Sequence, residues 1–124
     1  MRFLLDTHVL LWWLSENRRL PRAARDAIGA GEAVYVSAAT AWEIAIKTAL
    51  GKLDFNGSLE EQLRRNQFQP LPISIPHAMA AAALPLHHRD PFDRMLIAQA
   101  QLESLTLLTS DAKLNAYGAP VLMV

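Results

Sequence analysis

The sequence predicts an α/β fold in which helices cover both faces of a central, mainly parallel sheet. Short apolar runs alternate along the chain with segments of helical length, and the clearest runs lack the polar alternation of a half-exposed strand. Proline and glycine fall between these segments, as expected of turns. With 124 residues, 52% of them hydrophobic, the chain is expected to form one domain over residues 1–124 with a substantial core.

The first half of the chain should hold two strands and three helices. The run 2–5 reads as a buried strand that stops at an acid, and the Leu- and Trp-rich stretch 7–14 reads as a helix packed on it. Pro21 suits the first position of a helix that continues over 22–28. The apolar run 33–36 is a second strand, and Ser37 can cap a long helix that ends before Gly51.

The second half should hold four helices and three strands. Ser58 and Glu61 form a capping-box pattern that opens a helix, and 68–73 reads as an edge strand because two prolines forbid a central one. A further helix runs from Pro76 to residue 84, and Asp90-Pro91 opens another to about residue 103. The remaining elements are a strand over 105–108, a short helix over 110–117 and a strand over 121–124.

The composition excludes several classes of protein. There is no cysteine, which rules out disulfide frameworks and thiolate metal sites. Twelve basic residues balance twelve acidic ones, which disfavours a strongly basic nucleic-acid module. No uncharged apolar run reaches membrane-spanning length, and an acid at position 6 interrupts any signal-peptide core. We therefore expect a soluble protein of the cytoplasm, without contact to a membrane.

Four acids stand where the chain leaves a strand or enters a helix. Asp6 and Asp111 follow predicted strands, Asp93 lies in the first turn of a helix, and Glu43 lies on the long helix after the second strand. Each has a simpler explanation, as a helix cap, as a first-turn acid or, for Glu43, as the ion-pair partner of Lys47. Taken together they converge on one edge of a parallel sheet, which is where such sheets bind ligands.

Such a cluster calls for a cation. Two carboxylates about 5 Å apart repel by roughly 3 kcal/mol at an effective dielectric constant near 20. Hard divalent cations prefer oxygen ligands, and Mg²⁺ completes its shell with waters and phosphate oxygens. The acids alone therefore suggest metal-dependent chemistry on a phosphate or phosphodiester.

Four segments in order then resemble the motifs of PIN-domain proteins, most of all the VapC-type toxins of toxin–antitoxin pairs. The resemblance covers essentially the whole chain, and its motifs are Asp6-Thr7-His8-Val9-Leu10-Leu11-Trp12, Ser37-Ala38-Ala39-Thr40-Ala41-Trp42-Glu43-Ile44, His88-Arg89-Asp90-Pro91-Phe92-Asp93-Arg94 with the following Met95-Leu96-Ile97-Ala98-Gln99-Ala100, and Leu108-Thr109-Ser110-Asp111.

The resemblance implies a three-layer α/β/α sandwich and a ribonuclease dependent on Mg²⁺ or Mn²⁺. The family's acids match Asp6, Glu43, Asp93 and Asp111, which implies that they hold the metal and carry the catalysis, and Thr7 and Thr109 match hydroxyl positions that support them. The family pattern favours Asp93 over Asp90, which precedes a proline and suits a cap. The resemblance also implies an RNA product with a 5′-phosphate, a VapB-type antitoxin as partner and a homodimer.

Other residues have weaker interpretations. Arg89 and Arg94 flank the proposed site and are candidates for contacts with the RNA backbone. We expect His8 to pack near the first helix and His87-His88 to serve a loop or helix end. The three tryptophans are expected in core or subunit contacts rather than in base stacking, and they are Trp12, Trp13 and Trp42. Two alternatives stay open: a non-catalytic RNA-binding PIN scaffold, and a receiver-like domain phosphorylated on an aspartate.

Overall fold

The computed structural model describes residues 1–124 and contains a single five-stranded sheet in the order β3-β2-β1-β4-β5. All four strand pairs are parallel. The strands are β1 (Arg2–Leu5), β2 (Ala33–Ser37), β3 (Gln69–Leu71), β4 (Thr106–Thr109) and β5 (Val121–Met123). The proline-containing strand β3 lies at an edge of the sheet, as its sequence predicts.

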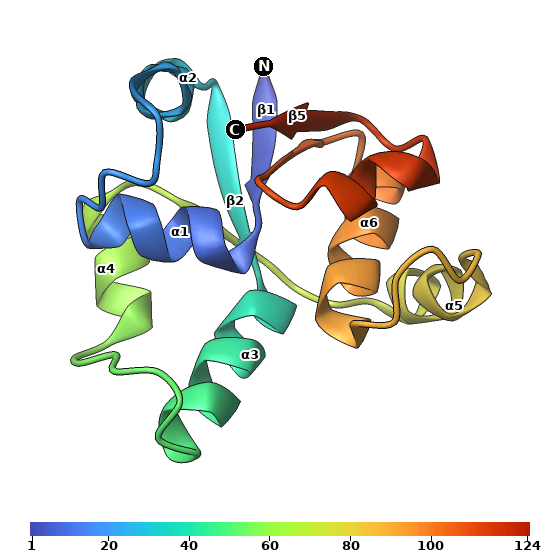
Figure 1. Cartoon of the computed structure of the whole chain (residues 1–124), viewed down its shortest axis with the longest axis horizontal. Helices are drawn as coiled ribbons and strands as arrows, with labels where there is room; N and C mark the ends of the chain where they lie inside the picture. The colour runs from blue at the N-terminus through green and yellow to red at the C-terminus, as the bar shows by residue number, and fades with distance from the viewer.

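Six α-helices and one 3₁₀ helix connect the strands. They are α1 (Thr7–Leu14), α2 (Arg22–Ala30), α3 (Ala38–Ala49), α4 (Leu59–Arg65), α5 (Ile75–Ala83), α6 (Pro91–Glu103) and the 3₁₀ helix η1 (Ala112–Tyr117). In Figure 1 the strands β1 and β2 stand upright, with α1, α2 and α4 on one side and α5 and α6 on the other. None of the helices has both the length and the apolar character needed to cross a lipid bilayer.

Alternate side chains of the central strands feed two separate cores. Phe3 and Leu5 of β1 join a cluster with residues of α1, α2 and α4, whereas Leu4 joins a cluster with residues of α6 and η1. Strand β4 divides in the same way, with Leu108 in the first cluster and Leu107 in the second. A sheet buried on both faces explains the unbroken apolar runs of its strands and confirms the predicted three-layer α/β/α sandwich.

Helix starts follow the predicted caps with two corrections. Ser58 accepts a hydrogen bond from the backbone N–H of Glu61, but the Glu61 carboxylate pairs with Arg64 and Arg65 instead of completing a capping box. The complete box lies at α5, where Ser74 and His77 exchange both bonds. Pro21 precedes its helix as the N-cap rather than opening it.

The topology places the candidate site. Parallel pairing brings Leu5 of β1 opposite Leu108 of β4, so the following residues, Asp6 and Thr109, lie side by side at the carboxyl edge of the sheet. The connection from β1 passes to β2 on one side of this point, while β4 lies on the other. Such a switch point opens a crevice in which α/β proteins bind ligands.

Candidate metal centre

Asp6 is a buried carboxylate held by two donors. Only 3% of the residue is exposed, and one carboxylate oxygen accepts the backbone N–H of Val9 at 2.8 Å, which caps α1. The other oxygen accepts the hydroxyl of Thr109. No lysine or arginine pairs with it, and burial, together with the nearby charge of Asp111, raises the pKa of Asp6 despite these donors. Asp6 is thus both the cap that its position allows and a charged group without a counter-ion.

Thr109 connects Asp6 to Asp111. Its hydroxyl donates to Asp6 and accepts the backbone N–H of Asp111 at 3.0 Å. Asp111 caps η1, with Oδ1 accepting the N–H of Lys113 at 3.0 Å. Its other oxygen, Oδ2, faces His88 Nε2 at 3.3 Å. The Thr109 hydroxyl therefore contacts one acid and the backbone of another.

Asp93 shares the histidine with Asp111. Its Oδ2 lies 2.8 Å from His88 Nε2, and both side chains are mostly buried. Burial raises the pKa of Asp93 to about 6, with further increases from the charges of Asp90 and Asp6, against an opposing effect of His88. A carboxylate that resists ionisation among other acids is typical of a functional site.

The other aspartate of the His88–Arg94 segment, Asp90, is a helix cap, as predicted. Its Oδ1 accepts the backbone N–H groups of Phe92 at 2.8 Å and of Asp93 at 3.2 Å, and Pro91 occupies the first turn of α6. These bonds occupy the Asp90 oxygen nearest the helix. Asp93 is thus the acid of this segment that points to the shared histidine.

Glu43 lies deeper, on the second turn of α3, and is 4% exposed. The Thr7 hydroxyl donates to its Oε1 at 2.6 Å, and Lys47 donates to its Oε2 at 2.6 Å. This is the i to i+4 ion pair that the sequence predicts, and it raises the pKa of Lys47, to which the charges of Asp90 and Asp93 also contribute. Glu43 therefore belongs to the same site but carries its own counter-ion.

The donor set fits a divalent cation. One ligand atom from each of His88, Asp93 and Asp111 lies within 4.8 Å of the others, while Asp6 and Glu43 stand outside this tightest group. Asp6 nevertheless acts electrostatically on Asp93. Asp6, Asp93 and Asp111 have no lysine or arginine partner, and their oxygens suit a hard cation, which would remove the mutual repulsion of the acids.

Arg89 and Arg94, both expected to contact the RNA backbone, differ in how free their side chains are. Arg89 is exposed next to His88 and free to meet a phosphate. Arg94 instead donates to backbone carbonyls at the end of α5 and in the segment that follows it, at Ala81, Ala82, Leu84, Pro85 and His88. Its guanidinium is engaged in holding this segment, which argues against the expected contact with RNA.

The sequence reasoning missed two features of the site. His88 was expected at a loop or helix end, but it bridges Asp93 and Asp111, and its only signal was its place five residues before Asp93. Trp42, expected in a core or subunit contact, is not in the core, because the residue is 63% exposed and meets Phe92 edge-on at 5.5 Å. Trp12 and Trp13 do pack, half-buried, against the core beside α1.

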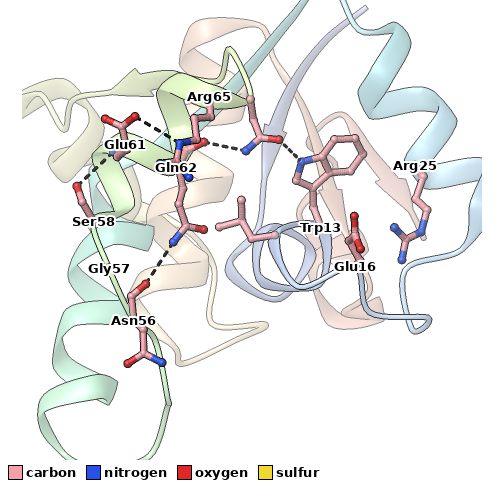
Figure 2. A pocket seen from close by; sticks show the side chains of 11 residues that line it. Trp13, Glu16, Arg25, Asn56, Gly57, Ser58, Glu61, Gln62 and Arg65 are labelled. Carbon is pink, nitrogen blue, oxygen red and sulfur yellow. Dashed lines mark hydrogen bonds and ion pairs between the residues drawn. The ribbon is translucent and has the colours of Figure 1, made fainter.

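The largest hollow of the surface lies away from the acids, at the far end of α1. It encloses about 580 Å³ between α1, the start of α2 and α4 (Figure 2). Trp13 and Leu14 provide its apolar wall, and Trp13 donates to Asn66 at 2.9 Å. Charged side chains surround it, namely Glu16, Arg25, Glu61 and Arg65. Its mixed lining suits a protein segment better than a small apolar ligand.

Comparison with known proteins agrees with this geometry. The family model for the PIN domain matches residues 3–120. The chain is 34% identical to Ribonuclease VapC22 of Mycobacterium tuberculosis (strain ATCC 25618 / H37Rv), over 94% of this chain and 92% of that protein. It superimposes on FitAcB from Neisseria gonorrhoeae with a TM-score of 0.67 and 28% identity, covering 96% of this chain and 95% of that one.

A further solved structure shows the same fold at lower identity. VapBC2 from Rickettsia felis, bound to a DNA fragment from its promoter, matches with a TM-score of 0.70 and 12% identity over 99% of this chain and 98% of that one. The family match, the VapC relative and the parallel sheet with its acidic edge confirm the expectation from the sequence motifs: the chain belongs to the PIN-domain family, as a relative of the VapC ribonucleases.

Proposed function

We propose that this chain is a VapC-type endoribonuclease toxin that hydrolyses RNA phosphodiester bonds with a divalent cation, Mg²⁺ or Mn²⁺. The observation that carries the proposal is the meeting of Asp6, Asp93 and Asp111 at the carboxyl edge of the sheet without a lysine or arginine partner. The 34% identity to a ribonuclease over nearly the whole chain supports the same substrate. The family match speaks against the receiver-like alternative.

In this proposal Asp93 and Asp111 hold the cation and Asp6 contributes charge or a third ligand. A divalent cation bound there would stabilise negative charge on the phosphate and lower the pKa of water. The chain itself fixes the acids, since the backbone N–H of Val9 and the hydroxyl of Thr109 hold Asp6, and the backbone N–H of Lys113 holds one oxygen of Asp111. This preorganisation is what electrostatic catalysis requires.

Glu43 is proposed to orient the attacking water. Thr7 and Lys47 fix its two oxygens within a buried site. The water oxygen attacks phosphorus, and the bond from phosphorus to the 3′ oxygen breaks. The products are a 5′-phosphate and a 3′-hydroxyl.

Two exposed side chains beside the acids are proposed to bind the RNA. Arg89 would meet a backbone phosphate. Trp42, supported by Phe92, offers an exposed aromatic face next to Glu43, on which a base can stack.

The proposed partner is a VapB-type antitoxin. Relatives of this fold have been solved as toxin–antitoxin complexes, among them one from Klebsiella pneumoniae with 24% identity and a TM-score of 0.69. The antitoxin would enter the hollow beside Trp13 and reach along α1 toward the acids with a helix or an extended tail. We further propose a homodimer, and a cytoplasmic location, where an RNA substrate is found.

Cleavage of a labelled RNA by the purified protein tests the proposal. We expect cleavage with Mg²⁺ or Mn²⁺, none with EDTA, and none by Asp6→Asn at a thermal melting point equal to or above that of the wild type. Cleavage that survives EDTA or the substitution overturns the proposed chemistry. RNA binding without cleavage under any metal would instead identify a non-catalytic PIN scaffold.

A further inference from the structure

Three hydrogen bonds from side chains hold the backbone of His88 in place. Its backbone N–H donates to the Tyr117 hydroxyl at 2.8 Å, and its carbonyl accepts from Arg94 and from Tyr117, each at 3.3 Å. The anchors come from α6 and η1, the two elements that also carry Asp93 and Asp111 at their starts. The imidazole is therefore held in place between these acids from both sides.

The contacts of the ring fix the position of its proton. Nδ1 accepts the backbone N–H of Arg89 at 3.1 Å, so this nitrogen carries no hydrogen. A neutral imidazole has one protonated nitrogen, which must here be Nε2. That N–H points to Asp93 Oδ2 at 2.8 Å and Asp111 Oδ2 at 3.3 Å.

This tautomer argues against direct ligation of a cation. A histidine that binds a metal through one nitrogen normally donates the proton of the other to a nearby acceptor. In this chain the other nitrogen faces a donor, the Arg89 N–H, so ligation through Nε2 would remove the only proton of the ring. His88 is thus arranged to donate to the acids and not to compete with them as a ligand.

We propose that His88 is a positioning residue whose Nε2–H holds the carboxylates of Asp93 and Asp111 together, so that a cation meets two ligands already in place. The inference rests on the proposed metal-dependent function and deepens it. A neutral donor suits this purpose, because it offsets the repulsion of two carboxylates without leaving a positive charge to repel the cation.

Calorimetric titration of the purified, EDTA-treated protein with Mn²⁺ tests the proposal, at about pH 8, where histidine is ordinarily neutral. Loss of a donor to a metal ligand commonly weakens metal affinity about 10- to 100-fold, which is the result expected for His88→Ala. His88→Gln places an amide N–H near the Nε2 position and should recover most of the affinity. His87→Ala removes the neighbouring exposed histidine and should bind Mn²⁺ as the wild type does.

Several outcomes overturn the inference. If His88→Ala binds Mn²⁺ as tightly as the wild type or more tightly, His88 only occupies the place of the cation. If His88→Gln is as weak as His88→Ala while thermal melts show both folded, hydrogen bonding is not the role of the ring. If the wild type binds no Mn²⁺, the proposed function falls as well, whereas unchanged affinity in the variants removes only the role of His88.

Nuclear magnetic resonance of ¹⁵N-histidine-labelled protein supplies a second measurement that does not depend on cleavage. We expect the Nε2-protonated tautomer of His88 before and after addition of Mg²⁺. Loss of the Nε2 proton on addition of Mg²⁺ would show direct ligation and overturn the proposal.

Discussion

The hydroxyl of Thr7 donates a 2.6 Å hydrogen bond to Oε1 of Glu43, which joins the start of α1 to the second turn of α3. Thr7 directly follows Asp6, so one dipeptide fixes an acid of the sheet edge and orients an acid of a helix. The hydroxyl also lies 3.3 Å from that of Thr40. The orientation of Glu43 thus depends on Thr7, and the end of strand β1 sets the position of Thr7.

Thr7→Val keeps the shape of this residue and removes its donor. We expect the free energy of unfolding to fall by about 1–3 kcal/mol, because a buried carboxylate oxygen loses a partner. RNA cleavage should fall with it, since Lys47 alone then orients Glu43. Urea unfolding and initial rates of cleavage measure the two effects, and Thr7→Ser should retain both. Full cleavage by a destabilised Thr7→Val would show that the orientation of Glu43 does not matter to the reaction.

Asp6→Asn should stabilise the metal-free protein. Because burial raises the pKa of Asp6, the folded chain disfavours its charge at neutral pH, and a neutral amide removes that penalty. The Thr109 hydroxyl can reverse and accept from the new amide. We expect the thermal melting point in EDTA to rise by about 3 °C or more, equivalent to about 1 kcal/mol. Mn²⁺ should then stabilise the wild type more than the variant, and a lower melting point in EDTA would contradict this account.

The layered fold was predictable because its signals are local. Short apolar runs such as Phe3-Leu4-Leu5 in β1, and the capped helices between the strands, point to a parallel sheet covered on both faces. The errors fall at element ends, where a polar side chain has more than one possible partner. The carboxylate of Glu61 could complete a capping box or pair with the arginines one turn ahead, and it pairs with the arginines.

The sequence singles out four acids, and the order of the elements predicts that they gather at one edge of the sheet, but not the contacts between them. The pairing of β1 with β4 puts Asp6 next to Thr109 at that edge. The bridge through His88 depends on anchors from Arg94 and Tyr117 that no spacing rule reveals. The position of Arg94 in the sequence indicates a phosphate ligand, but its guanidinium donates to backbone carbonyls at the end of α5 instead.

Asp93 should make the metal-free protein less stable as the pH rises. Its pKa is about 6 in the folded chain and about 3.9 in an unfolded one, so the folded state binds the proton more tightly. The contribution is complete below pH 4 and is lost as the pH rises through 6, with a size of about 2–3 kcal/mol. Urea unfolding of the wild type and Asp93→Asn in EDTA, from pH 4 to 8, isolates it. The difference between them should grow with pH and level off above 7, and a constant difference would exclude the raised pKa.

Trp42 should affect RNA binding and leave the fold unchanged. Its side chain is 63% exposed and touches Phe92 at the rim of the site. Stacking of a base on an aromatic ring contributes about 1–3 kcal/mol, so Trp42→Ala should raise the KM for RNA about 10-fold with little change in kcat. Trp42→Phe should keep most of the affinity. An unchanged KM in the alanine variant would remove the stacking role and leave a subunit contact as the reason for the exposed ring.

Of the two arginines in the His88–Arg94 segment, Arg94 should affect stability and Arg89 should affect RNA binding. Arg94→Gln leaves several carbonyls after α5 without a donor and releases the backbone of His88, so we expect a loss of about 2–4 kcal/mol in the free energy of unfolding. Weaker Mn²⁺ binding should accompany this loss, since the anchored histidine would no longer hold its acids. Arg89→Gln removes an exposed charge without a bonded partner, so its unfolding should match the wild type within about 0.5 kcal/mol. Its RNA binding should weaken and show a shallower dependence on salt concentration, as loss of one phosphate contact requires. A stable Arg94→Gln with the binding defect expected of Arg89→Gln would reverse the assignment of the two residues.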